Sequence, residues 1–275
     1  MVDADGLAVR LYRRPWRGLA AVLHGLSRVS LPWILWRVLT ANDPPITPPL
    51  LAEMLLVVWA LPGAAAWLIG RAFAGRARVD ADGLAIARGA QRGVVARERL
   101  AGARPWRLPL PEPGFALRLA DGRRPPFAVA ARDPTPLLAA LDPAAARHPV
   151  MVWAAARRPA PGPWYFVVRY VLFALPVAGV LFNAHQQIAY GGFLGQYYLL
   201  GLGAWLRTAA IYWATVGAYL LLYAGAWRGA AEGLALLAAV VAPARAALVR
   251  GVVERVCQVA FYLGVPVLLA LRFWA

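Results

Sequence analysis

A group of hydrogen-bonding side chains lies within an apolar stretch that carries no formal charge, "HQQIAYGGFLGQYYLLGLGAWL", at residues 185–206. Imidazole, amide and phenol groups can hold the headgroup of a quinone or of a polar lipid, or dock a neighbouring membrane subunit. The same composition also fits an aromatic belt at a membrane interface, with glycines for close packing. If the stretch binds a ligand, the residues expected to contact it are His185, Gln186, Gln187, Tyr190 and Gln196.

Charged residues inside apolar segments form a second group of candidates. A charge at the middle of a membrane costs about 2.5–3.5 kcal/mol on insertion scales, so each such residue should face protein or water. Glu53 lies at a depth similar to that of Arg37, which predicts an Arg37–Glu53 ion pair. Arg28 is then expected to bond to carbonyl groups or to a partner subunit, unless its helix is partly interfacial and Arg28 reaches the headgroups.

Motifs for catalysis and for metal binding are absent from the sequence. We find no phosphate-binding loop, no dinucleotide fingerprint, no HExxH and no Gly-x-Ser-x-Gly. The three histidines, His24, His148 and His185, match no spacing of metal ligands, and the single Cys257 cannot form a disulfide framework. We therefore expect no metal and no cofactor, and the sequence favours a non-enzymatic protein while leaving an enzyme as an open alternative.

The composition predicts a multi-pass membrane protein. The chain is 61% hydrophobic with a mean hydropathy of +0.56, whereas soluble domains are about 45–50% apolar. About 20 apolar residues cross a bilayer. The apolar segment 230–242 is too short to cross the bilayer, so we expect an interfacial helix near 229–249. If this segment crosses the membrane instead, a C-terminal topology reporter would show the C-terminus inside. The five expected transmembrane helices are residues 17–40, 49–70, 163–184, 207–227 and 252–273.

Charge predicts how these helices are oriented. Residues 71–158 hold sixteen arginines and seven acids, whereas the short link 41–48 has no arginine. By the positive-inside rule, residues 1–16 and 71–158 are cytoplasmic segments of a bacterial inner-membrane protein. A helical hairpin at 17–70 and a C-terminal bundle at 159–275 flank the block. The net charge of +16 is expected to meet anionic headgroups and not nucleic acid, because the arginines are dispersed without an aromatic stacking face.

The pattern of residues 71–158 is typical of a small β-rich domain. Apolar residues alternate with polar ones, and turns such as Asp82-Gly83 and Asp121-Gly122 interrupt them. Phe115, Leu117 and Leu119 share one face of a predicted strand. Asp133 can then cap a helix that begins at Pro134.

The order "VDADGLAIARGAQRGVVARERL", then "GFALRLADGRRPPFAVAA", then "DPTPLLAAL" resembles the bacterial pleckstrin-homology-like domain, in a version inserted between transmembrane helices. The resemblance implies hairpins closed by one C-terminal helix. Lipid-binding eukaryotic relatives carry a basic cluster at the first hairpin, where this chain has Asp80 and Asp82, so inositol-phosphate binding is not implied. Residues 2–8 repeat residues 79–85 identically, and we expect residues 2–12 to form a strand or hairpin against the domain.

Three functions fit these patterns. The first is a non-enzymatic membrane scaffold or accessory subunit, whose basic domain docks a protein partner or anionic lipid through Arg88, Arg92, Arg123 and Arg124. Its partners would be the bilayer and another membrane protein or a second copy. The second is an intramembrane enzyme subunit that binds a quinone or lipid at residues 185–198. The third is a transporter, because proline-interrupted spans can line cavities.

Overall fold

The computed structural model describes residues 6–40, 46–123, 125–157 and 162–274 of the 275-residue chain. The chain divides into two compact units. The first comprises Met1–Ser30, Val57–Arg158 and Ala230–Glu254, and the second comprises Leu31–Leu56, Pro159–Gly229 and Arg255–Ala275. The predicted β-rich block belongs to the first unit, and the polar stretch 185–206 belongs to the second.

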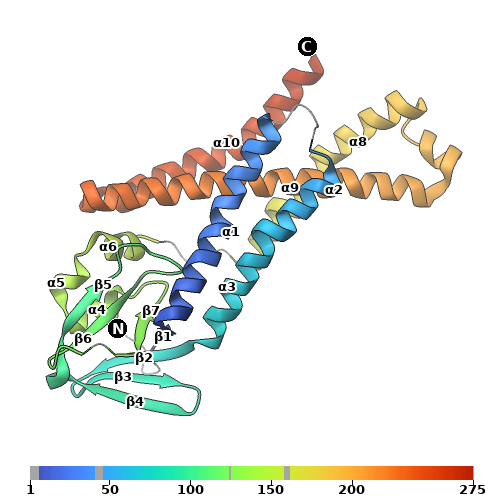
Figure 1. Ribbon diagram of the computed structural model, residues 1–275. Helices are drawn as coiled ribbons and strands as arrows, with labels where there is room; N and C mark the ends of the chain where they lie inside the picture. Colours follow the sequence, from blue (N-terminus) through green and yellow to red (C-terminus); the bar gives the residue numbers. More distant parts are fainter. Residues whose placement is uncertain (1–5, 41–45, 124, 158–161, 275) are drawn as a thin grey trace. The chain divides into compact units, whose positions relative to one another are not determined.

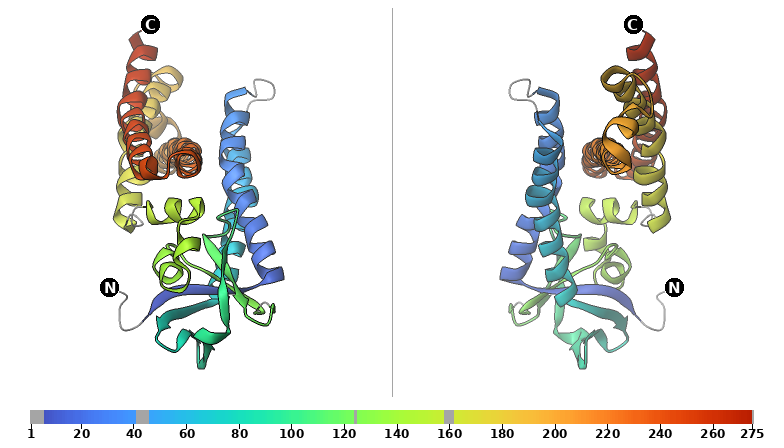
Figure 2. Two further views of the ribbon diagram at one scale, coloured as in Figure 1. Left: turned by 90° about the vertical axis from the view of Figure 1, so that its left-hand side faces the viewer. Right: turned by 90° about the vertical axis from the view of Figure 1, so that its right-hand side faces the viewer.

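One antiparallel sheet of seven strands, in the order β4-β3-β2-β1-β7-β6-β5, forms the centre of the first unit. Its two edge strands are consecutive in the chain and are joined by the short turn η2 (Arg97–Arg99). A link of this length between opposite edges requires the sheet to curl into a half-barrel (Figure 1, Figure 2). The predicted β-rich fold is confirmed. The strands are β1 (Leu7–Arg13), β2 (Ala74–Asp80), β3 (Gly83–Arg88), β4 (Gln91–Ala96), β5 (Leu100–Pro105), β6 (Gly114–Leu119) and β7 (Phe127–Ala130).

The N-terminal strand β1 lies in the middle of this sheet. It pairs with β2, where Arg10 faces Ala74, and with β7, where Arg13 faces Phe127. The expectation that the N-terminal segment adds a strand is confirmed for residues 7–12, and residues 2–5 lie outside the described residues. The chain leaves the sheet after β1 and returns at β2, so the helical hairpin is an insertion between two neighbouring strands. It consists of α1 (Arg14–Thr40), α2 (Pro48–Met54), the π-helical turn η1 (Leu55–Ala60) and α3 (Leu61–Ala72).

Apolar side chains on the concave side of the sheet form the main core. Phe115 and Leu117 alternate inward as the sequence predicts, and both are at most 1% exposed. Leu137 and Leu138 cover them from α4 (Thr135–Leu141). Asp133 accepts a hydrogen bond from the Thr135 amide at 3.0 Å, so α4 begins one residue later than expected. The single closing helix expected from the sequence is instead three short helices, because α5 (Pro143–Ala146) and α6 (Pro149–Ala155) follow.

Within the described residues, four stretches of helix are long and apolar enough to span a membrane: residues 14–40, 48–72, 164–190 and 195–241. Large apolar side chains such as Val29, Trp36, Leu39 and Leu68 are exposed on them. A surface of this kind indicates a membrane protein. The fifth predicted crossing lies within the continuous helix α10 (Ala246–Trp274), and it stays a prediction.

The helices of the C-terminal half differ from the sequence expectation at two places. The helix α9 (Gly195–Val241) continues through Arg228 and Gly229, so residues 230–241 are its last turns and not a separate helix. It ends before Pro243, as expected. The helix α8 (Ala174–Tyr190) follows α7 (Pro163–Phe166) and the π-helical turn η3 (Val167–Leu172). Residues 185–190 are the last residues of α8, so the polar stretch consists of the end of one helix, a turn and the start of the next helix. Gly191 ends α8 with a φ of 73°, a conformation that other residues rarely adopt.

Gly83 gives a test of the first hairpin. Its φ is 135°, and a Cβ atom there would lie 2.2 Å from the Val95 carbonyl oxygen and 2.7 Å from the Arg97 amide nitrogen. We expect Gly83→Ala to destabilise the first unit by roughly 1–3 kcal/mol, through backbone strain. Gly93→Ala is the matched control, because a Cβ at Gly93 meets nothing within 4 Å. Thermal unfolding of the purified chain in one detergent should show a lower midpoint for Gly83→Ala alone, and equal midpoints would contradict the strain.

Candidate anion-binding site beside the helical hairpin

A partly buried ion pair joins β1 to the loop between β5 and β6. Arg10 Nη1 lies 2.6 Å from Glu112 Oε1, with side-chain exposures of 30% and 24%. Glu112 is held there by a loop with prolines at positions 109, 111 and 113, each of which fixes its own φ. The pair therefore connects the central strand to a loop more than one hundred residues later in the chain.

Three further guanidinium groups act on the Glu112 carboxylate. Arg28 comes from α1, Arg132 follows β7 and Arg157 follows α6. Burial raises the pKa of Glu112, while the charges of Arg10, Arg157, Arg28 and Arg132 partly oppose that rise. Arg28 and Arg132 are exposed, whereas Arg10 and Arg157 are partly buried. The region around Glu112 is therefore rich in basic side chains, and positive charge of this kind attracts anions.

Aromatic and small residues surround this arginine cluster. A Cβ atom on Gly70 of α3 would lie 3.1 Å from the Arg10 guanidinium carbon and from the Tyr12 hydroxyl oxygen, so a larger residue there would require these side chains to shift. Tyr12 is fully buried, and burial raises the pKa of its hydroxyl group. Arg17 lies over the Trp106 ring at 3.8 Å. The Nε2 atom of His24 is buried without a hydrogen-bond partner in the described part of the chain.

A second buried arginine continues the cluster on helices α9 and α10. Arg250, which is 2% exposed, donates hydrogen bonds to Glu232 and, at 3.3 Å, to the Trp153 carbonyl oxygen of α6. The Trp153 ring lies 5.0 Å from the Arg157 guanidinium and 5.4 Å from that of Arg250. Burial lowers the pKa of Arg157 and Glu232 opposes this shift. Sequence reasoning missed Glu232 and Arg250, although an acid inside an apolar helix signals a need for a basic partner.

The predicted ligand residues of the second unit form a closed hydrogen-bond network. The Gln186 side chain donates to Gln196 Oε1 at 2.7 Å, and Gln196 donates to Thr208 Oγ1 at 2.9 Å. The two glutamines are at most 5% exposed. The His185 ring packs on Tyr190 and Tyr212 with centroids 6.0 and 5.5 Å apart.

Gln187 is exposed and lies outside this network. The structure thus brings together Gln186 with Gln196 and His185 with Tyr190. Because the buried amides bond to one another and to Thr208, their arrangement favours a role in holding α8 against α9.

The other predicted site residues are dispersed. Among the described ion pairs there is none between Arg37 and Glu53, both of which are exposed, and this pairing stays a prediction. Arg28 belongs to the cluster around Glu112.

Three of the four predicted docking arginines are described, and their environments differ. Arg88 lies 4.7 Å from the Phe73 ring centroid and donates to the Ala72 carbonyl oxygen at 2.9 Å. Arg92 is exposed on β4. Arg123 lies 3.8 Å from the Asp121 carboxylate. Arg124 lies outside the described residues.

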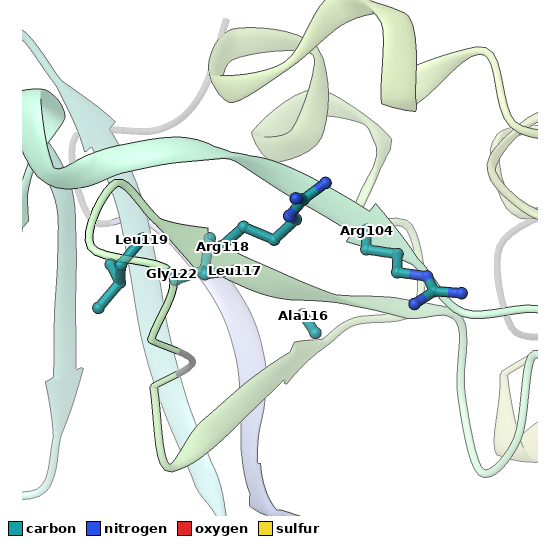
Figure 3. Close-up of a pocket in the computed structure, with 6 residues that line it drawn as sticks. All are labelled: Arg104, Ala116, Leu117, Arg118, Leu119 and Gly122. Atoms are coloured by element: carbon teal, nitrogen blue, oxygen red, sulfur yellow. The ribbon is translucent and has the colours of Figure 1, made fainter.

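A hollow of about 330 Å³ opens on β5 and β6 (Figure 3). Two arginines from adjacent strands, Arg104 and Arg118, reach into its lining. The rest of the lining is Ala116, Leu117, Leu119 and Gly122.

Comparisons of the chain with protein-family models, with curated proteins and with solved structures found no match. The function is therefore argued from the geometry of the two units.

Glu112 predicts a pH dependence of stability. Its pKa in the folded chain is raised above the ordinary value of 4.5. The contribution of the neutral carboxyl group to stability is therefore complete below pH 4.5 and is lost as the pH rises through the folded pKa. Glu112→Gln stays neutral, so we expect its unfolding midpoint to rise relative to that of the wild type between about pH 4 and pH 7.

The matched control for this pH series is Glu98→Gln, an exposed carboxylate of the turn η2. This variant keeps Glu112 and should follow the wild-type curve. A wild type that gained stability over Glu112→Gln with rising pH would contradict the prediction, because attraction to the arginines would then outweigh burial.

Substitution of Gln196 tests how much the buried amides contribute to the stability of the second unit. Gln196→Ala leaves the Gln186 amide buried without its partner, which should destabilise the second unit by about 1–3 kcal/mol. Gln187→Ala removes an exposed amide from the same stretch and should change little. Replacing both buried glutamines by leucine should recover part of the loss, because no donor is then left unpaired. Unfolding midpoints in detergent measure all three, and an unchanged Gln196→Ala would contradict a structural role.

Proposed function

We propose that this chain is a non-enzymatic membrane scaffold whose basic sheet domain binds anionic lipid headgroups at the inner face of a bacterial cytoplasmic membrane. The observation that carries the proposal is the Arg10–Glu112 ion pair, together with the charges of Arg28, Arg132 and Arg157 that also act on the Glu112 carboxylate. This cluster lies beside α1 and α3, which are apolar enough to enter a membrane. A phosphate group at this position would meet guanidinium donors and Trp106 at the height where headgroups and interfacial tryptophans occur.

The domain that presents the cluster is proposed to be pleckstrin-homology-like and split by the helical hairpin. The curled antiparallel sheet and the helices that follow β7 support this assignment. In the proposed orientation the arginine-rich residues 71–158 face the cytoplasm, as the positive-inside rule favours. Quinone-binding or lipid-modifying chemistry at residues 185–198 is less well supported, because Gln186 and Gln196 already satisfy each other.

The lipid proposal is tested with two double variants that remove the same amount of positive charge from different positions. Arg132→Gln combined with Arg157→Gln should weaken the affinity of the full chain in detergent for short-chain phosphatidylglycerol by roughly tenfold or more, since each basic residue near an anionic headgroup adds about 1 kcal/mol. Isothermal titration measures the affinity, and phosphatidylcholine of the same chain length is the lipid control.

Arg92→Gln combined with Arg97→Gln removes the same charge from exposed positions on β4 and η2. This pair should keep the wild-type affinity. Equal weakening by both pairs would show general charge attraction, and loss with the control pair alone would place lipid binding at the first hairpins. Either result would overturn the proposed site.

A further inference from the structure

The hollow on β5 and β6 lies along the part of β6 that is not paired with β7. Pairing between these strands is limited to Gly114 with Ala130 and Phe115 with Val129, whereas β5 accompanies β6 as far as Leu119. The Leu119 amide donates to the Arg123 carbonyl oxygen at 3.2 Å, and the turn at Gly122 closes the open end. Figure 3 shows the two strands diverging, with Ala116 and Gly122 at the margins of the gap. From residue 116 onward, one side of β6 therefore faces this space.

The backbone of Leu117 is directed towards the gap. Phe115 bonds to β7 on that side and the Leu119 amide bonds to Arg123 on that side. Backbone groups of alternate residues in an antiparallel strand point the same way, so the amide and carbonyl groups of Leu117 share this direction. They are placed to bond with the main chain of a bound segment.

Arg104 and Arg118 set the charge and the spacing of the hollow. In the register Arg104 faces Ala116 and Arg118 faces Gly102, so the two arginines are diagonal neighbours on one face of the strand pair. Figure 3 shows both side chains extending across that face. Both are exposed, and in the described part of the chain neither forms an ion pair. Two cations are thus held side by side above a space of about 330 Å³.

The distance between the two arginines matches a particular arrangement of anions. Diagonal neighbours on an antiparallel pair are about 7–8 Å apart. Carboxylates on alternate residues of an extended chain are separated by two rises of about 3.3 Å, or roughly 6.6 Å. A single phosphate group would use the charges but not this spacing. Two of the other lining positions, Ala116 and Gly122, carry a methyl group or no side chain, so they take up little of the hollow.

We propose that this hollow binds an extended acidic segment of a partner protein, with acidic residues at positions i and i+2 that contact Arg118 and Arg104. The interaction uses residues separate from the cluster around Glu112, so it does not depend on lipid binding there. It adds a protein partner to the scaffold and specifies the pattern by which that partner is recognised.

The experiment compares two peptides of identical composition, one with glutamates at alternate positions and one with the same glutamates contiguous. Each carries a fluorophore, and its anisotropy is followed as the full chain is added in detergent. The alternating peptide should bind more tightly. Arg104→Gln and Arg118→Gln should each weaken its binding by roughly tenfold, as expected for the loss of one charge-assisted contact. Arg92→Gln, at an exposed arginine of β4, is the charge-matched control and should bind as the wild type does.

Ala116→Leu keeps every charge and fills the hollow, so it should also abolish binding of the alternating peptide while phosphatidylglycerol binding is unchanged. Equal affinity for both peptides, or wild-type affinity in Ala116→Leu, would overturn the proposal. Two other results would also overturn it: displacement of the peptide by inorganic phosphate at a lower concentration than by unlabelled peptide, or loss of phosphatidylglycerol binding in Arg104→Gln without loss of peptide binding.

Discussion

The position of β1 in the centre of the sheet is the constraint on which the first unit depends. The strand before the helical hairpin, β1, pairs with the strand after it, β2. This pairing can form only when the two ends of the hairpin lie next to each other. The antiparallel pairing of Arg10 with Ala74 fixes those ends next to one another. Gly70 of α3 can then lie against Arg10 and Tyr12. The register of two strands therefore fixes where the hairpin begins and ends, and α1 carries Arg28 close enough for its charge to act on the Glu112 carboxylate.

Two carboxylates accompany the arginines that this fold brings close together. Bringing guanidinium groups together without a carboxylate would be costly, since like charges repel one another and lose hydration where they are partly buried. Glu112 reduces that repulsion, and Glu232 does the same for Arg250 and Arg157. Each carboxylate neutralises one positive charge and leaves the others. Arginine suits such a site because its charge is delocalised and its donors are fixed in one plane, so it remains a donor when partly buried.

Local chemistry in the sequence predicted the elements of the sheet but not the cluster. Asp82-Gly83 and the alternation of Phe115 with Leu117 depend on residues close in the chain, and the structure contains the corresponding turn and strand. The repeated segment at residues 2–8 and 79–85 correctly indicated a further strand. Arg10, Glu112 and Arg157 meet only through the fold. The helix end expected near Arg228 was wrong, because one glycine in an apolar helix costs about 1 kcal/mol, which packing can offset.

The polar groups of the two units differ in whether their interactions are complete. In the second unit, Gln186 and Gln196 form hydrogen bonds with each other, and Gln196 also bonds to Thr208. A ligand that entered there would have to replace these bonds, so the pairing resists its entry. In the first unit, cations outnumber the acids that face them around Glu112, and Arg104 and Arg118 share no acid in the described residues. Basic side chains attract an anion at long range, whereas the paired amides of the second unit carry no net charge. Electrostatics therefore favours the sheet domain over the buried amides as the place where an anion would bind.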